Sequence, residues 1–537
     1  MTHKKYTIIG SGISGINAAL TLLKKGHTVE IIDFDNEDNM PIDTSETFES
    51  IKMNKSIDSL KFFYGSDLKN LVQNKPDQLF TFPKRRKGIT KDNIYKYDQS
   101  VDLFEPQHGY CNGGLGSFWG ANSIEFNQDD LIDFGINKSD FQSIYAELGN
   151  RFAISGGIND DISKIANDSF NIEHSRSTSF AEDRLLHAYN KSNSHDFKMG
   201  LSRLAINSDP LSKNSCYKSG LCIWRCPNSS IYDPKQTLSE CKRYANFKYS
   251  TGFTVLYFKS SDNDPSNIKK IVYKDVNGNL NEINVENIIL AAGAINSSVI
   301  HLRSLFENGF TDSIKIRSAG LMDTQVVKIP YINPYGAKSD FNTSKIQFNN
   351  LTAFIKINSK KFPDWAQAEL MSLGPLIYYP LINKVGLGIK NSLFAFNKIK
   401  SSLSVSSIFI PDQLDKNNYL ELDFSSKNIK LNFHYHQSKS VAYVKKQVVN
   451  TFVNNMRKMG MLVSKSSAIH FKHGDGIHYA GTIPIKLKKT FGCVDRDCKS
   501  YDFNNLHVVD GAVFPSLPSK SISLNLAANA IRVANKL

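Results

Sequence analysis

The stretch Tyr6-Thr-Ile-Ile-Gly10-Ser-Gly12-Ile-Ser-Gly15-Ile-Asn-Ala-Ala-Leu20 decides the fold. A β-branched run ends in three glycines at G-x-G-x-x-G spacing, and an Ala/Leu-rich segment follows without a break. This is the dinucleotide-binding fingerprint in its required context, with a strand before it and a helix after it. Gly10 permits the tight turn, Gly12 lets the backbone approach a pyrophosphate, and Gly15 lets the helix pack close to the strand. The stretch therefore predicts an α/β fold of the Rossmann type.

A second strand-like run, Val29-Glu-Ile-Ile-Asp33, follows the predicted helix. Its acid, Asp33, comes about 20 residues after the glycines, where a carboxylate can accept hydrogen bonds from a ribose hydroxyl. The free N–H groups and the dipole at the helix N-terminus attract phosphate charge. We therefore expect Ile13 and Ser14 in the turn, and Phe34 after the acid, to contact the same ligand. The alternative is a glycine turn kept for packing alone.

Composition restricts the class of protein. The chain has 537 residues, 41% hydrophobic and 22% charged, which predicts two domains of an ordinary globular protein. The net charge of +14 is compatible with a nucleic acid, an anionic membrane or an acidic substrate as partner. No nucleic-acid module is recognisable, so we expect no nucleic-acid partner. A Lys- and Asn-rich composition that reflects codon usage is the simpler explanation of the charge.

The sequence also indicates a compartment. The basic start Met1-Thr-His-Lys-Lys5 is followed by an apolar run that glycines interrupt, which is not a secretory signal. No stretch has the roughly 20 apolar residues of a spanning helix. Seven cysteines, an odd number, favour free thiols over a disulfide framework. We therefore expect a cytoplasmic protein.

Three later segments carry small residues of the kind that lets a backbone approach a ligand. The first is Tyr110-Cys-Asn-Gly113-Gly114-Leu-Gly116-Ser117-Phe-Trp119-Gly120-Ala-Asn122, with four glycines within eight residues. The second, Ala291-Ala292-Gly293, follows an apolar strand-like run, and the third is Asp510-Gly511 at the end of another. A predicted helix at 522–537 follows the third segment and can direct its positive end at a ligand. We expect all three segments to contact one large, flat ligand.

A cysteine-rich turn and a cationic stretch allow more than one interpretation. Cys216, Cys222 and Cys226 resemble an iron–sulfur run, but the fourth thiolate that such a cluster needs is missing, so we expect no metal. Residues 370–411 are apolar and basic, and include Leu373-Gly-Pro-Leu-Ile-Tyr-Tyr-Pro with lysines but no acid after it until Asp412. This stretch is either a peripheral contact with an anionic membrane, which would be the inner membrane, or a buried helix pair over the substrate.

Together these segments resemble the glucose–methanol–choline (GMC) oxidoreductases, which are FAD enzymes. The resemblance rests on the fingerprint, the Gly113–Gly120 segment, Cys226-Pro227, Ala291-Ala-Gly293, His478-Tyr-Ala-Gly481-Thr482 and Asn505-Leu-His-Val-Val-Asp510-Gly-Ala-Val-Phe-Pro515. It implies a discontinuous Rossmann-type FAD-binding domain and a second α+β substrate-binding domain built on an antiparallel sheet. The implied boundaries are 1–45, 95–130, 230–305 and 490–537 for the first domain, 131–229 and 306–489 for the second, and 46–94 for a loop or lid-like insertion.

The resemblance also implies a set of cofactor contacts. The residues it places at FAD are Gly10, Gly12, Ile13, Ser14, Gly15, Asp33, Phe34, Gly114, Ser117, Trp119, Gly120, Asn122, Val255, Ala292, Gly293, Asp510, Gly511 and Ser521. Some sugar-oxidising relatives attach FAD covalently through a histidine within the glycine segment. Here that neighbourhood is Ser117-Phe118-Trp119, so we expect noncovalent FAD.

The same resemblance assigns the chemistry. His478 matches the catalytic histidine of the family, and an unperturbed histidine titrates near the working pH of a general base. The family often has a second His or Asn before the last helix, and Ser521 occupies that place here, with Lys520 and Asn525 as the next candidates. The implied reaction oxidises an alcohol, such as a sugar hydroxyl in the manner of bacterial members, to a carbonyl. Hydride passes to flavin N5 and His478 takes the hydroxyl proton.

Two other functions stay open at the level of sequence. One is a flavoprotein of another reaction class, an amine oxidase or a double-bond reductase, that shares only the Rossmann half. The other is a catalytically impaired, membrane-associated flavin-binding scaffold. The electron acceptor, whether oxygen, a quinone or a protein, also stays open.

Overall fold

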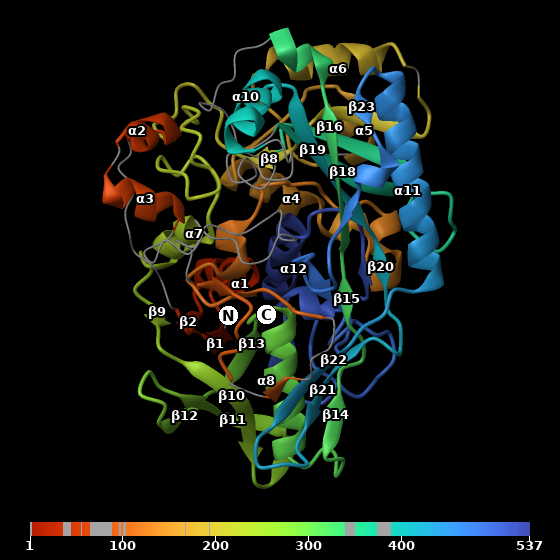
Figure 1. Cartoon of the computed structure of the whole chain (residues 1–537). Coiled ribbons are helices and arrows are strands. Elements are labelled where there is room, and N and C mark those ends of the chain that lie inside the picture. Colours follow the sequence, from red (N-terminus) through yellow and green to blue (C-terminus); the bar gives the residue numbers. More distant parts are fainter. Residues whose placement is uncertain are drawn as a thin grey trace.

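Two sheets organise the computed structural model of the chain (Figure 1). The structure describes residues 3–35, 45–54, 56–64, 88–95, 98–99, 104–166, 168–192, 194–338, 349–372 and 388–537. A five-stranded parallel sheet occupies the lower half of Figure 1, and a larger antiparallel sheet lies above it. The first sheet contains the glycine turn of the opening stretch, and the second lies over the predicted catalytic end of the chain.

The parallel sheet has the strand order of a Rossmann half. Its order is β26-β13-β1-β2-β9, every neighbouring pair is parallel, and α1 (Ile13–Lys24) connects β1 to β2. The strands are β1 (Lys5–Ile9), β2 (Thr28–Ile32), β9 (Phe247–Ser250), β13 (Asn287–Leu290) and β26 (Leu506–Val508). In chain order this is 3-2-1-4-5, the arrangement of mononucleotide-binding α/β folds.

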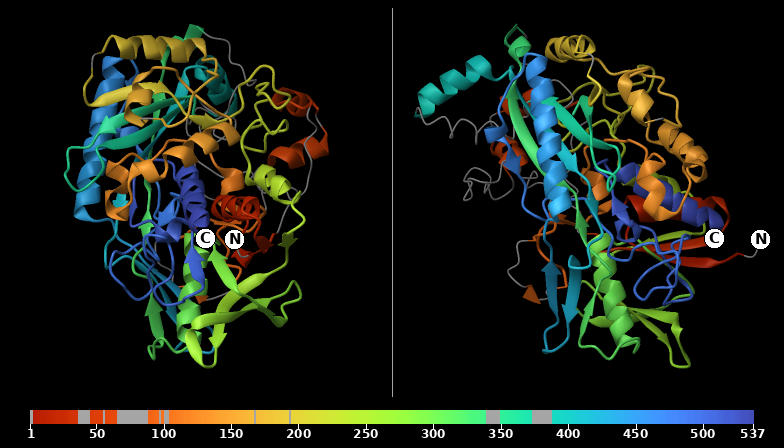
Figure 2. Two further views of the ribbon diagram at one scale, coloured as in Figure 1. Left: turned by 180° about the vertical axis from the view of Figure 1, so that it is seen from behind. Right: turned by 90° about the vertical axis from the view of Figure 1, so that its right-hand side faces the viewer.

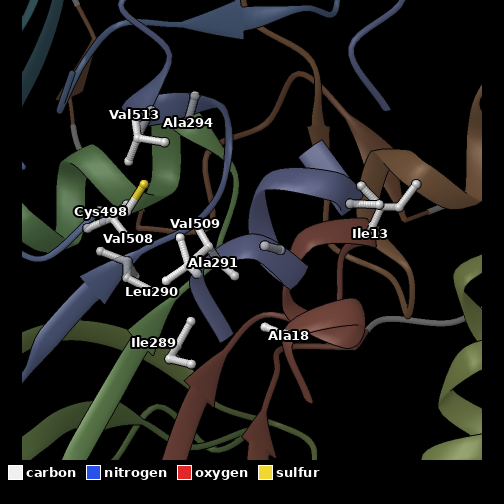
Figure 3. Packing of buried hydrophobic residues seen from close by; sticks show 14 of the residues in the cluster. Ile13, Ala18, Ile289, Leu290, Ala291, Ala294, Cys498, Val508, Val509 and Val513 are labelled. Atoms are coloured by element: carbon white, nitrogen blue, oxygen red, sulfur yellow. The ribbon is translucent and has the colours of Figure 1, made fainter. Parts of the chain in front are cut away.

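Layers on both sides bury this sheet. Figure 1 shows α1 and α12 (Ser523–Lys536) above it, and the antiparallel strands β10 (Thr254–Ser261), β11 (Asp264–Lys274) and β12 (Leu280–Asn284) below it. Burial on both faces explains why the last three residues of β13 are all apolar and fully buried. Figure 3 shows this packing: Leu290 and Ala291 at the end of β13 lie beside Val508 and Val509, with Ile13 and Ala18 of α1 nearby.

The antiparallel sheet has two unlike faces. Its order is β23-β16-β19-β18-β17-β7, and β24 also pairs with β16. The strands are β7 (Phe197–Leu201), β16 (Gln325–Ile332), β17 (Leu351–Lys356), β18 (Trp365–Ser372), β19 (Leu403–Ile410), β23 (Leu462–Val463) and β24 (Ile469–His470). Val327 and Ile408 on one face form an apolar core with Val448 and Phe452 of α11 (Lys439–Lys458). We call this the outer face, and the opposite one the inner face.

Shorter elements complete the fold. The helices are α2 (Phe48–Met53), α3 (Ile57–Tyr64), α4 (Gln142–Arg151), α5 (Asp161–Ala166), α6 (Phe180–Asn190), α7 (Pro234–Cys241), α8 (Ala294–Glu307) and α10 (Ile389–Ile399). The short strands include β3 (Ile89–Thr90), β4 (Asp98–Gln99), β5 (His108–Gly109), β6 (Ile154–Ser155), β8 (Leu204–Ala205), β14 (Lys315–Arg317), β15 (Met322–Asp323), β20 (Asp412–Gln413), β21 (Tyr419–Asp423), β22 (Lys430–His434), β25 (Tyr479–Ala480) and β27 (Ser516–Leu517).

The predicted fold class is confirmed: a Rossmann-type domain is joined to a second domain with an antiparallel sheet. The helix expected at 522–537 is α12. Leu131, Phe134 and Tyr145 belong to the same hydrophobic cluster as the buried residues of the parallel sheet, and this cluster extends into both predicted domains. The predicted domain boundaries stay a prediction. The predicted 46–94 insertion contains α2 and α3, and most of its remainder lies outside the described residues.

The cationic stretch at 370–411 is not one continuous surface. Residues 403–410 form β19, a central strand of the antiparallel sheet, and residues 373–387 lie outside the described part of the chain. The described helix of this stretch is α10, which projects from the body of the molecule in the right-hand view of Figure 2. Among the helices that the structure describes, none is long and apolar enough to cross a membrane.

Candidate active site

The two glycine segments, about 100 residues apart in the sequence, lie directly against each other. A Cβ atom built on Gly114 would lie 3.6 Å from the Cα atom of Gly12, and one on Gly116 would lie 3.2 Å from the Cβ atom of Ile13. The Gly113 N–H donates to the Ser11 hydroxyl oxygen over 3.1 Å. The predicted convergence of these segments on one place is therefore present in the fold.

The three glycines of the fingerprint differ in what surrounds them. A Cβ on Gly15 would lie 2.1 Å from the Gly10 carbonyl oxygen, and one on Gly10, where φ is +97°, would lie 2.6 Å from the Ala291 carbonyl oxygen. Gly12 is open: among the described residues, the only atom within 4 Å of its built Cβ is the Ala291 carbonyl oxygen, at 3.9 Å. Packing explains Gly10 and Gly15, whereas close approach of a ligand explains Gly12. This open cradle fits a dinucleotide pyrophosphate.

Asp33 lies directly after β2, beside the glycine turn. One carboxylate oxygen accepts the Ser11 N–H at 3.1 Å and the Tyr249 hydroxyl at 3.3 Å, and also pairs with the Ser11 hydroxyl. Burial raises the pKa of Asp33 to about 6, and the nearby charge of Asp35 adds to the rise. Sequence reasoning did not find Ser11 and Tyr249 as part of this network. Ser11 stood within the quoted fingerprint, while Tyr249 required knowledge of the β2–β9 pairing.

Phe34 and Val255 lie at the same end of the sheet. The Phe34 ring meets Tyr110 edge-on, with ring centroids 5.8 Å apart. The Gly252 N–H donates to the Phe34 carbonyl oxygen over 3.1 Å, and β10 with the buried Val255 starts two residues later. Both predicted residues are thus beside Asp33, where the resemblance implies the adenosine end of FAD.

Asp510 connects the second and third small-residue segments. Its carboxylate accepts the Gly293 N–H at 2.9 Å, the Ser297 hydroxyl at 2.5 Å and the Ala512 N–H at 2.9 Å. Burial raises the pKa of Asp510 to about 6. The carboxylate caps the N-terminus of α8, where a negative charge is favourable. Gly293 has φ of +85°, and no atom of the described part of the chain lies within 4 Å of a built Cβ, so Ala292-Gly293 forms a second open edge.

The segment that carries His478 lies on the Asp510–Gly511 turn. A Cβ on Gly511 would lie 2.5 Å from the Tyr479 carbonyl oxygen, so only glycine fits there. The Gly481 N–H donates to the Gly511 carbonyl oxygen over 3.3 Å. On its other side, the His478 carbonyl oxygen accepts the Thr324 N–H over 3.2 Å. The fold therefore places the His478 segment beside Gly511, in the C-terminal part of the chain.

The His478 ring is held without using up its own hydrogen-bonding capacity. It stacks on Phe409, with ring centroids 5.9 Å apart and an interplanar angle of 22°. Its Nδ1 atom is buried and has no hydrogen-bond partner among the described residues. Burial lowers the pKa of His478 to about 4, so the imidazole is neutral at pH 7. A neutral imidazole with a partnerless nitrogen is able to accept a proton.

The three candidates for the second catalytic residue have different surroundings. Lys520 donates to the Glu125 carbonyl oxygen at 3.1 Å and forms a buried ion pair with Asp130. The Asn525 side-chain oxygen accepts a hydrogen bond from the Tyr145 hydroxyl over 2.6 Å, and the side-chain nitrogen donates to the Ile124 carbonyl oxygen over 3.0 Å. These contacts give both residues structural roles. Ser521, which is buried, stays the predicted partner.

The predicted flavin-side residues after Gly116 have mixed roles. The Trp119 indole N–H donates to the Tyr232 carbonyl oxygen over 2.9 Å, and the Ser117 hydroxyl donates to the Gly114 carbonyl oxygen over 2.9 Å. No atom of the residues that the structure describes lies within 4 Å of a Cβ built on Gly120. Both polar side-chain atoms of Asn122 are buried and have no partner in the described part of the structure. A buried, unsatisfied amide costs stability, so it fits a site that a polar cofactor completes.

The cysteine turn has few metal-ligating neighbours among the residues that the structure describes. Cys216, Cys222 and Cys226 are partly buried and are not joined in disulfides, and burial raises the pKa of Cys216. Within the described ranges, no group of three or more His, Cys, Asp or Glu side chains is arranged to hold a metal ion. Trp224 of this turn packs instead on Phe48 of α2.

Comparison with known proteins gives one matching family model and several solved structures with the same fold. Residues 420–530 match the family described as GMC oxidoreductase. The resemblance to the GMC oxidoreductases is confirmed. The matched range contains both His478 and the Asp510–Gly511 turn. No curated protein matches the sequence.

Three solved structures share the fold over nearly the whole chain. Pyridoxine 4-oxidase from Mesorbium loti has a TM-score of 0.60 at 13% identity and covers 99% of each chain. A formate oxidase variant from Aspergillus oryzae RIB40, studied for FAD modification, has a TM-score of 0.61 at 13% identity and covers 99% of this chain and 98% of its own. An FAD-dependent oxidoreductase from Chaetomium thermophilum gives 0.57 at 13%, with the same coverage. At this identity they show the fold of the chain and no more.

Proposed function

We propose that this GMC-type oxidoreductase uses FAD to oxidise an alcohol, a sugar or sugar-like hydroxyl, to a carbonyl. The observation that carries the proposal is His478. Its neutral imidazole has a buried nitrogen without a partner among the described residues. The His478 segment packs on the Asp510–Gly511 turn, and the Asp510 carboxylate accepts the N–H of Gly293 at the open glycine edge. A packing role alone would not require the imidazole nitrogen to be left without a partner.

The residues present fit FAD. The open cradle at Gly12 and Gly114 would hold the pyrophosphate, Asp33 the ribose, and the Asn122 amide a polar edge of the flavin. When bound, FAD supplies the two-electron oxidising power. The glycine segment contains Ser117-Phe118-Trp119 and no histidine, so we propose noncovalent binding. Denaturation should then release unmodified FAD into the supernatant.

The chain's own part in the reaction is to orient the alcohol and to take its proton. Stacking on Phe409 and the backbone contact with Thr324 fix the direction of the His478 imidazole. Being neutral at pH 7, this imidazole can accept the hydroxyl proton, and Ser521 would orient the same hydroxyl from the last helix. Since the base must be neutral, turnover should be retained above the pKa of His478, about 4, and lost below it.

The test is anaerobic reduction of the bound flavin by a panel of sugars, primary alcohols and amines. His478→Ala should keep its FAD and lose at least about 10³-fold in the rate of reduction, as expected when a general base is removed. His187→Asn on the exposed side of α6 is the matched control and should behave as wild type. Full reduction of His478→Ala would exclude the assigned base. Amines as the sole reductants would indicate an amine oxidase, and no reductant at all would favour the impaired scaffold.

We further propose that the cytoplasmic protein rests on an anionic membrane, the inner face of the inner membrane, through α10. Leu393, Phe394 and Ile399 of this helix are 41%, 68% and 43% exposed. Lysines flank them, and no acid occurs between residues 388 and 411. An exposed apolar face with a cationic border binds the headgroup region of anionic lipid bilayers.

Sedimentation with vesicles of phosphatidylcholine and phosphatidylglycerol tests this contact. Wild-type protein should sediment at low salt and less at high salt. Replacing Leu393 and Phe394 with Ser should abolish the binding. Leu211→Ser, which removes a residue that is 93% exposed elsewhere, should not. Absence of binding, or equal binding by the α10 variant, would remove the proposal.

A further inference from the structure

A groove of about 770 Å³ lies at the edge of the antiparallel sheet, beside the last residues of β16. Pockets that bind small molecules have volumes of about 300–1,000 Å³. Thr324, whose N–H contacts the His478 backbone, lies just before the other end of β16, whereas Tyr331 lines the groove. At about 3.3 Å per strand residue, Thr324 and Tyr331 are roughly 23 Å apart. The groove is therefore separate from the candidate active site.

The walls of the groove are largely apolar. Pro330, Ile332, Leu403 and Val463 are half-buried, and Leu462 of β23 is 61% exposed. β23 pairs with the end of β16 and β24 with its middle, so Pro330 lies between the two paired segments. Because proline has no N–H, the strand edge offers no backbone donor at this position. An exposed apolar groove of this kind indicates a binding site for an apolar group.

Arg457, in the last turn of α11, also lines the groove. Its Nε–H donates to the Val463 carbonyl oxygen over 2.9 Å. Among the residues that the structure describes, no carboxylate lies within 4.0 Å of its guanidinium group. A helix C-terminus favours cations, which is one reason for Arg457 and Lys458 but not for Lys465 in the turn beyond β23. The Nη1 and Nη2 atoms of Arg457 are able to bind an anionic group side by side.

The chain around the groove has a long stretch without acids. Residues 424–474, which include α11, β23 and β24, contain lysines and an arginine but no Asp or Glu. Leu403 follows α10, and residues 388–411 contain no acid either. Glu182 of α6 is a nearby acid, and it accepts the Ser179 N–H at the start of its own helix over 2.7 Å. The surroundings of the groove therefore favour an anionic ligand.

We propose that the groove binds one acyl chain of an anionic phospholipid and that Arg457 binds its phosphate. An acyl chain is apolar along its length, as the groove walls are, and a phosphate accepts the two N–H groups that an arginine presents side by side. α10 ends at Ile399, shortly before Leu403 in the groove, so a lipid held here would belong to the same membrane leaflet as the proposed α10 contact. The inference goes beyond the proposed oxidation and uses neither FAD nor His478.

Short-chain phospholipids below their micelle concentration test the groove without a membrane. Dihexanoylphosphatidylglycerol, titrated calorimetrically into the full chain, should bind. Diheptanoylphosphatidylglycerol should bind about 4-fold more tightly, because one further buried CH₂ contributes about that factor. Dihexanoylphosphatidylcholine, whose headgroup has no net charge, should bind at least about 10-fold more weakly.

Two exposed groove residues have matched controls elsewhere on the surface. Arg457→Gln should weaken the binding of dihexanoylphosphatidylglycerol at least about 10-fold and remove the difference between the two headgroups. Leu462→Ser should weaken the binding of both phosphatidylglycerols about 10-fold. Arg243→Gln, at an exposed arginine just after α7, and Leu487→Ser, at a leucine that is 65% exposed, should bind as wild type. Each variant changes an exposed side chain, so its Tm should stay within about 3 °C of wild type.

Weaker binding by both groove variants and by neither control supports the inference, whether or not an alcohol reduces the flavin. Replacing Leu393 and Phe394 of α10 with Ser should leave the binding of these monomeric lipids unchanged, and its loss there would overturn the groove as the site. No binding by wild type, binding that either groove variant leaves unchanged, or equal affinity for the two headgroups would also overturn the inference. So would binding of laurate without binding of the phospholipids, which would indicate a free fatty acid.

Discussion

The parallel-sheet region and the antiparallel-sheet region present different kinds of chemical group at the candidate site. Around the parallel sheet, the elements that converge are glycines and backbone N–H groups, as at Gly12 and Gly114. Around the antiparallel sheet, they are side chains, as where the Phe409 ring stacks on His478. One region offers shape and backbone dipoles, and the other offers individual chemical groups.

This difference indicates which region can change its ligand specificity. A glycine cradle is the same for every protein that binds the same pyrophosphate, because it depends on a fixed backbone path. Side chains on a sheet face can be exchanged singly without altering the strands. The first region therefore supports a constant cofactor, while the second can adapt to a particular substrate.

The largest effect is expected for a substitution whose new side chain would collide with the neighbouring backbone. Gly15→Ala would place a Cβ 2.1 Å from the Gly10 carbonyl oxygen and 3.2 Å from the Ala291 Cβ. Ala normally stabilises a helix by up to about 1 kcal/mol relative to Gly, yet here α1 would be forced off β1. We expect no folded protein, measured as the loss of a cooperative thermal transition. Gly120→Ala, where nothing lies within 4 Å, is the control and should unfold as wild type.

A smaller, more selective effect is expected at Gly12. Its built Cβ meets only the Ala291 carbonyl oxygen, at 3.9 Å, so Gly12→Ala should fold with a Tm within about 3 °C of the wild-type apoprotein. The methyl group would occupy the space of the pyrophosphate. FAD affinity, measured by fluorescence titration of the apoprotein, should fall at least about 10-fold. Unchanged affinity would mean that the open cradle is not a ligand contact.

The cofactor side could be predicted from sequence because spacing alone defines it. The second glycine segment lies against the fingerprint, and the Asp510 carboxylate accepts the Gly293 N–H, as the prediction of one common ligand requires. The ligand contacts themselves stay a prediction. Tyr249 could not be found this way. It reaches Asp33 only because β9 pairs with β2, although the two strands are more than 200 residues apart.

The substrate side depends on register, which one sequence does not reveal. Phe409 is one apolar residue among several in its strand, and the pairing of β19 with β16 brings it to the His478 segment, which contacts Thr324. Lys520 and Asn525 had suitable chemistry for catalysis, but burial against Asp130 and Tyr145 gives them structural contacts. Tertiary packing decides whether a lysine amine is available for catalysis or is held in an ion pair.

The smallest expected effect concerns Asp323, a positioning residue under the His478 segment. Asp323 is 1% exposed, and its carboxyl group accepts the Gly474 N–H over 2.7 Å. Its strand, β15, pairs with Tyr479 next to His478. Burial raises the pKa of Asp323 well above its usual value, and the neighbouring charge of Asp412 adds to the rise. The carboxyl group should therefore be held neutral well above the pH at which an exposed aspartate ionises.

An amide has nearly the shape and hydrogen-bonding pattern of that neutral carboxyl group. Asp323→Asn should keep turnover within about 3-fold of wild type, whereas Asp323→Ala leaves the Gly474 N–H without its partner and loses about 1–3 kcal/mol of stability. Above pH 4 the unfolded state of the wild type ionises Asp323, so the stabilisation from the neutral form is complete below about 3.8 and is lost as pH rises through the folded pKa. Tm measured from pH 5 to 9 should therefore decline more steeply for wild type than for Asp323→Asn. Equal damage by Asn and Ala would mean that the carboxylate is ionised, and that charge as well as shape positions His478.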